Sequence, residues 1–141
     1  MGEVNHRWVD TNGIKMHVAE QGEGPLVVFC HGFPELWYSW RHQLPALAKA
    51  GYHAVAPDQR GYGQTDRPEA IEAYHILALT GDIVGLVAAL GEERAIVIGH
   101  DWGLPLPGTA PCCGRTSSMP SSCSASPISA APGRTSARQS R

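Results

Sequence analysis

A five-residue segment, Gly99-His100-Asp101-Trp102-Gly103, has the spacing of a reactive side chain held in a sharp turn between two small residues. In such a nucleophile elbow the flanking positions need glycine, because a Cβ would collide with neighbouring backbone. The central residue is Asp101, which is ionised at neutral pH and can attack an activated sp³ carbon to form a covalent ester. The simpler alternative is an aspartate that caps a helix N-terminus in a glycine-rich turn.

A second motif, His31-Gly32-Phe33-Pro34, directly follows the apolar run 26–30. We expect the backbone N–H groups of Phe33 and Trp102 to converge on one oxygen, as an oxyanion hole does. They would stabilise the tetrahedral intermediate that forms when water cleaves the Asp101 ester. The alternative for this motif is a plain turn at a strand end, with a cis peptide bond before Pro34. Because both motifs follow strands, a reactive site is favoured over two unrelated turns.

The elements that must position these motifs are predicted from apolar periodicity and turn residues. Continuous apolar runs predict buried strands, and apolar stripes at helical spacing predict helices, the first with an irregular start because it contains Pro45. The expected order is a strand at 6–9, a turn at 11–13, a strand at 14–19, buried strands at 26–30, 52–56 and 95–98, and helices at 37–50 and 73–90. A hairpin followed by alternating strands and helices predicts an α/β fold with a mostly parallel sheet. Ligands bind such sheets at the carboxyl ends of the strands.

The composition is that of an ordinary globular protein, with 141 residues, a formal net charge of −2 and 43% hydrophobic residues. We expect one domain at most, and neither nucleic acid nor a membrane as a partner. No apolar run approaches the ~20 residues of a membrane span, and residues 1–10 do not resemble a secretory signal. A cytoplasmic location is therefore the default expectation. The four cysteines lack zinc-type spacing, and we predict no metal, no cofactor and no disulfide framework.

The composition changes sharply at Gly103. Every acidic residue and every Trp, Tyr and Phe lies before residue 104, whereas 104–141 are rich in Ser, Pro, Ala and Gly with a few arginines. Such a segment can bury little apolar surface. We therefore predict a folded region at 1–103 and a disordered, low-complexity tail at 104–141. Without a neighbour from the tail, the strand at 95–98 is expected to form an exposed apolar edge.

Four segments together resemble the soluble epoxide hydrolases, which have the α/β-hydrolase fold. They are 31–35, the aromatic run 37–41, the segment 57–63 and the elbow at 99–103, and the similarity covers about residues 5–103. The resemblance implies that an aspartate opens a small-molecule epoxide to form an ester, that tyrosines of a cap domain bind the epoxide oxygen, and that a histidine paired with an acid activates water.

Carried over by position, the resemblance implies a role for each motif residue of this chain. Asp101 is the nucleophile, and Phe33 and Trp102 are the oxyanion donors. The residues that shape or support the two loops are His31, Gly32, Pro34, Arg60, Gly99, His100 and Gly103. The other histidines, at positions 6, 17, 42, 53 and 75, are expected to be surface or packing residues, as is His100.

Two related families share part of this pattern. Haloalkane dehalogenases have the same Asp-Trp elbow but usually carry Asn where this chain has Phe33. Fluoroacetate dehalogenases share the His-Gly-Phe-Pro motif but usually carry Arg where this chain has Trp102. The combination of Phe33 and Trp102 favours an epoxide hydrolase. No catalytic cofactor or metal is implied, and the oligomeric state stays open.

The resemblance also implies parts that these 141 residues lack. In the family, a helix, a further strand, a cap domain, an acid and a catalytic histidine follow the elbow, whereas every histidine here precedes Asp101. Pro105 and Pro107 would also break the helix after the elbow. We therefore expect a truncated and inactive fragment; the alternative is a non-catalytic binding remnant.

The genetic code offers a reason for the change in composition. When the last base of each codon is read with the first two bases of the next, the stretch from Gly108 on can encode WHRALLRPDVFDAVVVLSVPY, provided that third bases are chosen to fit. That reading resembles the expected continuation after the elbow, with a helix, a loop and a buried strand. One base lost near the Gly103 codon would account for the change.

Overall fold

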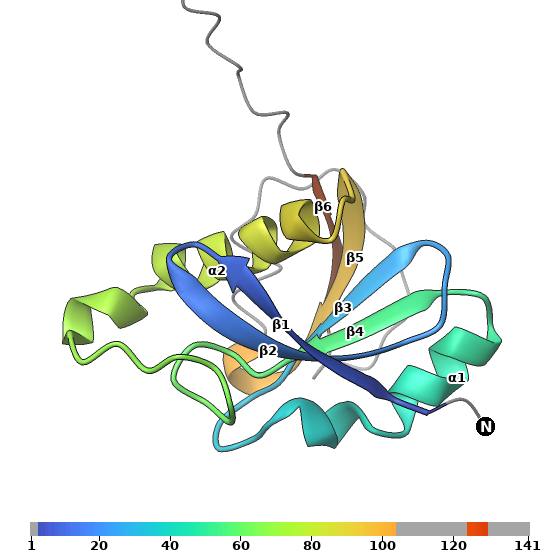
Figure 1. The fold of residues 1–141 in the computed structure, drawn as a ribbon, viewed down its shortest axis with the longest axis horizontal. Coiled ribbons are helices and arrows are strands. Elements are labelled where there is room, and N and C mark those ends of the chain that lie inside the picture. The colour runs from blue at the N-terminus through green and yellow to red at the C-terminus, as the bar shows by residue number, and fades with distance from the viewer. Residues whose placement is uncertain (1–2, 104–123, 130–141) are drawn as a thin grey trace, which may run out of the picture.

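The computed structural model describes residues 3–103 and 124–129. These form one sheet with the strand order β1-β2-β4-β3-β5-β6, and helices cover its two faces (Figure 1). The strands are β1 (Asn5–Thr11), β2 (Ile14–Gln21), β3 (Leu26–Cys30), β4 (His53–Pro57), β5 (Arg94–Gly99) and β6 (Ser124–Ser129). The helices are α1 (Gln43–Lys49) and α2 (Ile76–Ala89), with short 3-10 turns at Trp37–Trp40, Ile71–Tyr74 and Asp101–Gly103.

Strands β1 and β2 form the predicted hairpin. Asn12 and Gly13, with φ of 46° and 77°, make the two-residue turn between the paired residues Thr11 and Ile14. Positive φ at both turn positions matches the right-handed twist of the strands and explains the Asn-Gly sequence. Strand β2 also pairs antiparallel with β4, whereas β3 pairs parallel with both β4 and β5. The prediction of an α/β fold with parallel central strands is confirmed.

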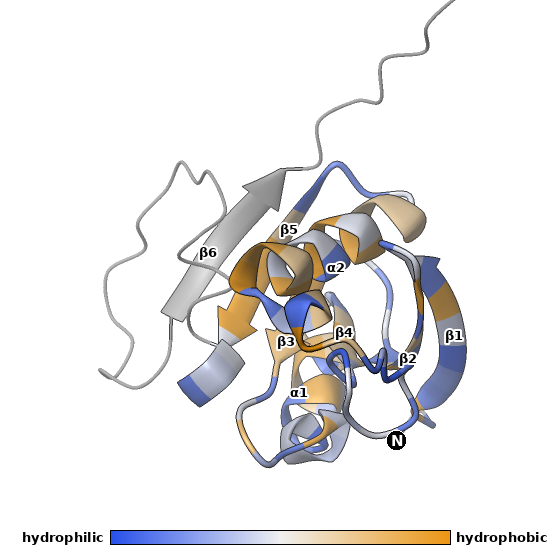
Figure 2. Ribbon diagram, turned by 90° about the vertical axis from the view of Figure 1, so that its left-hand side faces the viewer, coloured by the Kyte–Doolittle hydropathy of each residue, from blue (hydrophilic) through white to orange (hydrophobic). Residues whose placement is uncertain are grey.

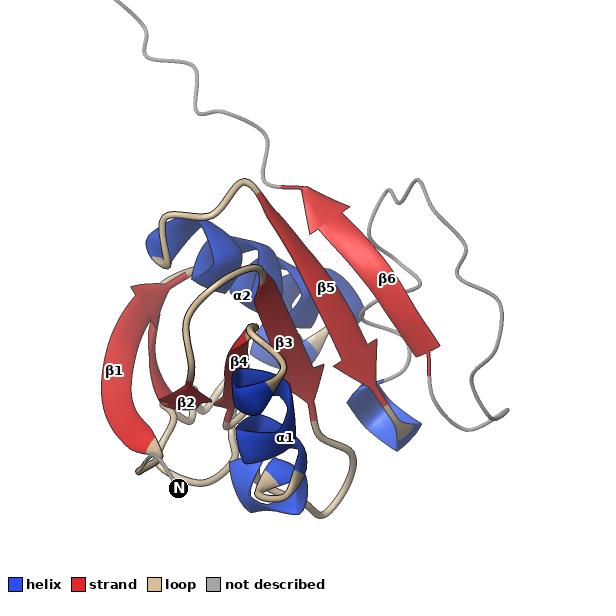
Figure 3. Cartoon of the chain, turned by 90° about the vertical axis from the view of Figure 1, so that its right-hand side faces the viewer, coloured by secondary structure: helices blue, strands red, loops and turns tan. Residues whose placement is uncertain are grey.

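Two apolar layers enclose the central strands. On one face α2 packs on alternate residues of the sheet, and on the other α1 packs on the residues between them (Figures 2 and 3). All five residues of β3 are buried, as expected of a strand covered on both faces. Strand β3 contributes residues to both apolar layers, and the loop that leaves its carboxyl end starts from this buried strand.

Both predicted helices are shorter than the sequence pattern indicated. The first region divides into a 3-10 turn and α1, and Pro45 lies in the first turn of α1, where its missing N–H is not required. Helix α2 begins at Ile76 because the imidazole of His75 accepts a hydrogen bond of 3.1 Å from the N–H of Ala78. In the described part of the chain, no helix is long and apolar enough to cross a membrane.

Strand β6 was not expected. It pairs antiparallel with β5, with Ile96 opposite Pro127, so the prediction that the strand at 95–98 is an exposed edge is wrong. The physical reason is that backbone pairing requires only N–H and C=O groups and not an apolar sequence. Pro127 lacks an N–H, which an outer strand tolerates. Residues 104–123 and 130–141 lie outside the described residues, and so does most of the predicted disordered tail.

Candidate active site

The elbow, residues 99–103, is a tight turn at the end of β5 in which backbone segments approach closely. Asp101 has a φ of 51°, in the left-handed region, and the N–H of Gly103 donates 2.9 Å to the carbonyl of His100. A Cβ on Gly99 would collide with the carbonyl oxygen of Gly103, and a Cβ on Gly103 would collide with that of Cys30. The glycines therefore let the turn close, and the strained backbone of Asp101 presents its side chain at the carboxyl end of the sheet.

The loop after β3 brings a backbone donor to the Asp101 carboxylate. The N–H of Phe33 donates to Asp101 Oδ2 at 2.9 Å, and Gly32 lies so close that a Cβ there would be 2.7 Å from the Asp101 Cβ. The N–H groups of Phe33 and Trp102 both lower the pKa of Asp101 below 3.8. The two donors named from the sequence thus meet at Asp101, and its carboxylate is ionised at neutral pH. The Phe33–Pro34 peptide bond is cis.

His31 fixes the shape of this loop. Its Nδ1–H donates 2.8 Å to the carbonyl of Gly32, while its Nε2 accepts 3.0 Å from the backbone N–H of Gln59. The side-chain amide of Gln59 also donates to the carbonyl of His31. Burial lowers the pKa of His31, which keeps the ring neutral and its Nε2 able to accept. Sequence reasoning missed Gln59; its only signal was its position in the segment 57–63.

Arg60 supports the loop that follows β4. Its guanidinium makes a two-pronged ion pair with Asp82 of α2, at 2.8 Å from Nε to Oδ2 and 2.6 Å from Nη2 to Oδ1. The amide of Asn12 in the hairpin turn donates to the same carboxylate at 2.8 Å. Hairpin, loop and helix are therefore joined at one buried charge pair, and losing one partner of such a pair costs about 3–5 kcal/mol.

His100, in the elbow, contacts residues of the segment that follows β3. Its Nε2 lies 2.8 Å from Glu35 Oε2, and its ring packs edge-on against Trp40 with centroids 5.2 Å apart. This agrees with the expected packing role for His100. The ring of His100 therefore lies between the elbow and the loop that carries Glu35.

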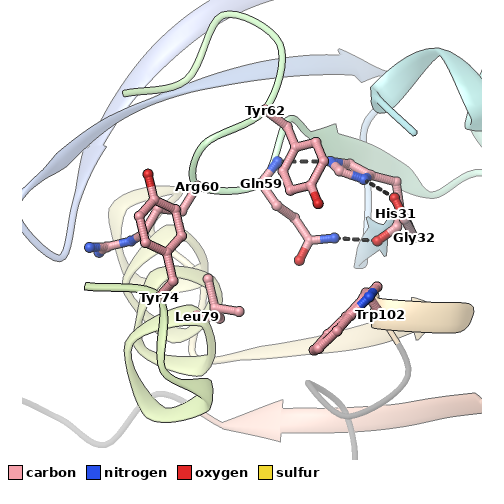
Figure 4. A pocket seen from close by; sticks show the side chains of 8 residues that line it. All are labelled: His31, Gly32, Gln59, Arg60, Tyr62, Tyr74, Leu79 and Trp102. Carbon is pink, nitrogen blue, oxygen red and sulfur yellow. Dashed lines mark hydrogen bonds between the residues drawn. The ribbon is translucent and has the colours of Figure 1, made fainter. Parts of the chain in front are cut away.

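A cavity of about 190 Å³ opens beside the elbow. Figure 4 shows Trp102 on one side of it, with Tyr74 and Leu79 on the opposite side. The residues that line it are His31, Gly32, Gln59, Arg60, Tyr62, Tyr74, Leu79 and Trp102. The indole of Trp102 and the ring of Phe33 are 61% and 62% exposed. Within 3–103 and 124–129, no group of three or more His, Cys, Asp or Glu residues is placed to hold a metal.

Comparison with known proteins places this geometry in a family. The model of the alpha/beta hydrolase fold family matches residues 25–103. Epoxide hydrolase A of Mycobacterium tuberculosis is 60% identical over 113 residues, which cover 79% of this chain and 35% of that protein. Epoxide hydrolase 3 of Siraitia grosvenorii is 54% identical over 73% of this chain and 33% of that protein. The AB hydrolase superfamily protein YfhM of Bacillus subtilis is 53% identical over 73% of this chain and 37% of that protein.

A solved structure shows the same similarity in three dimensions. The crystal structure of epoxide hydrolase VrEH1 from Vigna radiata superposes with a TM-score of 0.73 at 60% identity, over 75% of this chain and 33% of that one. The chain thus spans about a third of the length of the relatives it matches. It belongs to the alpha/beta hydrolase fold family, and within that family it is similar to epoxide hydrolases.

Proposed function

We propose that residues 3–103 carry the nucleophilic half of an epoxide hydrolase site, with Asp101 as the nucleophile and the N–H groups of Phe33 and Trp102 as the oxyanion donors. The observation that supports this most directly is the 2.9 Å hydrogen bond from Phe33 N–H to Asp101 Oδ2, at a residue whose φ is 51°. The high identity to proteins named epoxide hydrolases supports the choice of substrate class.

The first step follows from the orientation of the carboxylate. Oδ2 accepts from Phe33 N–H and becomes the carbonyl oxygen of the ester, so Oδ1 is the atom that attacks. A new bond forms from Oδ1 to a ring carbon of the epoxide, and the C–O bond of the ring breaks. Its electron pair stays on the epoxide oxygen, which takes a proton from water or an acidic group. The donors remain on the carbonyl oxygen, where negative charge develops when the ester is hydrolysed.

The second step needs a general base, which the described histidines near Asp101 do not supply. Both nitrogens of His31 are engaged, one by Gly32 and one by Gln59, and His100 is directed to Glu35. We therefore propose that the 141-residue polypeptide by itself stops at the alkylated Asp101. It would form one ester per molecule and would not release diol over multiple turnovers.

Intact-protein mass measurement after incubation with styrene oxide tests both steps. We expect the mass to rise by one styrene oxide, peptide mapping to place it on Asp101, and Asp101→Asn to remove the adduct. A parallel incubation with 1-chlorohexane tests the haloalkane dehalogenase alternative, since the same carboxylate would then release chloride. Sustained diol production would contradict inactivity, and an Asp101 left unmodified by either electrophile would contradict the nucleophile.

A further inference from the structure

Away from the elbow, three side chains form a continuous hydrogen-bonded series from the interior to the surface. The Nδ1 of His17 lies 2.8 Å from Asp58 Oδ2, and the Nε2 of His17 lies 3.1 Å from the Nδ1 of His6. The side chains of His17 and Asp58 are 0% and 2% exposed, whereas His6 is exposed. His17 lies on β2, His6 lies on β1, and Asp58 directly follows β4, so the sheet aligns the three residues.

Asp58 acts as a hydrogen-bond acceptor in every contact of its carboxylate that we find. Its Oδ1 accepts 3.0 Å from the backbone N–H of Trp37, and its Oδ2 accepts 3.2 Å from that of Gln64 as well as the bond from His17. A Cβ on Gly63 would collide with this carboxylate, so the loop closes tightly over it. The carboxylate is thus fixed in position, and with it the ring of His17.

The Asp58 carboxylate determines which nitrogen carries the hydrogen in each neutral ring. A neutral His17 carries its hydrogen on Nδ1, where it faces the carboxylate, and its lone pair on Nε2. His6 must then donate from Nδ1, and its Nε2 keeps the lone pair that makes a neutral imidazole a nucleophile. The ring of His6 lies nearly parallel to that of His17, with centroids 5.2 Å apart, and meets Trp37 edge-on at 4.8 Å, so its orientation is also defined.

We propose that His6 is an acyl-accepting nucleophile, with His17 as its base and Asp58 as the group that orients the base. The order of nucleophile, base and acid is that of a catalytic triad, with an imidazole in place of a hydroxyl. Nε2 of His6 attacks the carbonyl carbon of the donor, and the bond to the leaving group breaks with its electron pair. The Nδ1 proton of His6 passes to Nε2 of His17, and water later hydrolyses the N-acyl bond.

The surroundings of His6 favour an uncharged donor with an apolar or aromatic group. The indole of Trp8, 49% exposed, lies over His17 at 5.3 Å, and Trp37 borders His6 itself. Arg7, the neighbouring cation on β1, is paired with Glu20 at 2.9 Å and therefore engaged. An activated ester or carbonate fits this aromatic site better than a phosphate does. This inference does not depend on Asp101.

Diethyl pyrocarbonate, an uncharged activated carbonate, is the probe, and peptide mapping over time gives a rate for each histidine. His42, exposed at the start of α1 and without a side-chain capping bond, is the internal control. We expect His6 to react about tenfold faster than His42, which is a modest effect for general-base assistance. The same ratio is expected in an Asp101→Asn background, which separates this reaction from any chemistry at the elbow.

The variant His17→Gln tests the proton transfer itself. Its amide N–H can donate to Asp58 and its carbonyl can accept from His6, so both hydrogen bonds are kept while the base is lost. We expect His6 then to react no faster than His42. Equal rates in the original protein, or a fast His6 that His17→Gln leaves unchanged, would overturn the proposal. If His17→Gln does not fold, the solvent isotope effect decides: the rate at His6 should be higher in H₂O than in D₂O, whereas the rate at His42 should be the same in both.

Discussion

The backbone N–H of Gln59 donates a 3.0 Å hydrogen bond to Nε2 of His31, and through that ring the loop after β4 fixes the loop after β3. The other ring nitrogen holds the carbonyl of Gly32, directly before the Phe33 N–H that reaches Asp101. The position of the Phe33 N–H therefore depends on the loop after β4, a neighbouring strand. It also depends on a neutral His31, because a protonated ring could not accept from Gln59.

This dependence predicts a loss of stability at low pH. Burial lowers the pKa of His31 from 6.5, so the unfolded chain takes up a proton near pH 6.5 that the folded chain still excludes. The contribution of His31 to the free energy of unfolding is therefore full above 6.5 and declines as the pH falls toward the folded pKa. Urea unfolding of the original protein and of His31→Gln, compared across this range, measures it. The difference between the two proteins should shrink as the pH falls, and a constant difference would contradict the prediction.

The glycines of the elbow predict a second measurable effect. Gly99→Ala places a Cβ against the carbonyl oxygen of Gly103, and backbone cannot move aside easily. We expect a loss of about 3 kcal/mol in the free energy of unfolding, which is typical of backbone strain in a packed region. Gly91→Ala is the matched control, since it has a φ of 82° but open space around it, and should cost about 1 kcal/mol. Equal losses for both substitutions would show that the elbow is not tightly closed.

The ionisation of Asp101 sets the pH dependence of its alkylation. The N–H groups of Phe33 and Trp102 hold its pKa below 3.8, and only the carboxylate attacks an epoxide. The rate of adduct formation with styrene oxide should thus be constant near neutral pH, and its midpoint in acid should lie below the ordinary aspartate pKa of 3.8. Intact-protein mass measurement at a series of pH values follows this rate. A midpoint above 3.8 would mean that the two N–H groups do not favour the charged form of Asp101.

Much of the fold and the two site loops could be predicted because each depends on local chemistry. The Asn-Gly turn, the continuous apolar strands and the paired glycines of the elbow each determine their own conformation. Gln59 could not be predicted, because its role exists only once β3 and β4 lie side by side. His6 and His17, interpreted as surface or packing residues, are eleven positions apart along the chain, and only the register of the β1–β2 hairpin brings their rings together.

Strand β6 could not be predicted for a different reason. Its sequence, SASPIS, has no apolar alternation, and it pairs antiparallel with β5 through the backbone. The same segment belongs to the stretch whose composition differs so sharply from that of 1–103. Sequence patterns report on which side chains a strand buries, and backbone pairing by itself leaves no such pattern.

The final prediction concerns the gene. We propose that one base is missing near the Gly103 codon, so that residues 104–141 are read out of frame. One position needs no choice of bases: Met119 has a single codon, ATG, and proline codons begin with CC, so the shifted reading across Met119 and Pro120 must be GCC, which encodes alanine. Alanine therefore stands at that place in every shifted reading, including WHRALLRPDVFDAVVVLSVPY, whose pattern resembles a helix, a loop and a buried strand. Sequencing the gene through and beyond this region tests the proposal. We expect the shifted frame to continue into a cap domain and a histidine that follows an acid. A shifted frame that meets a stop codon within residues 104–141, or that encodes no such histidine, would refute it.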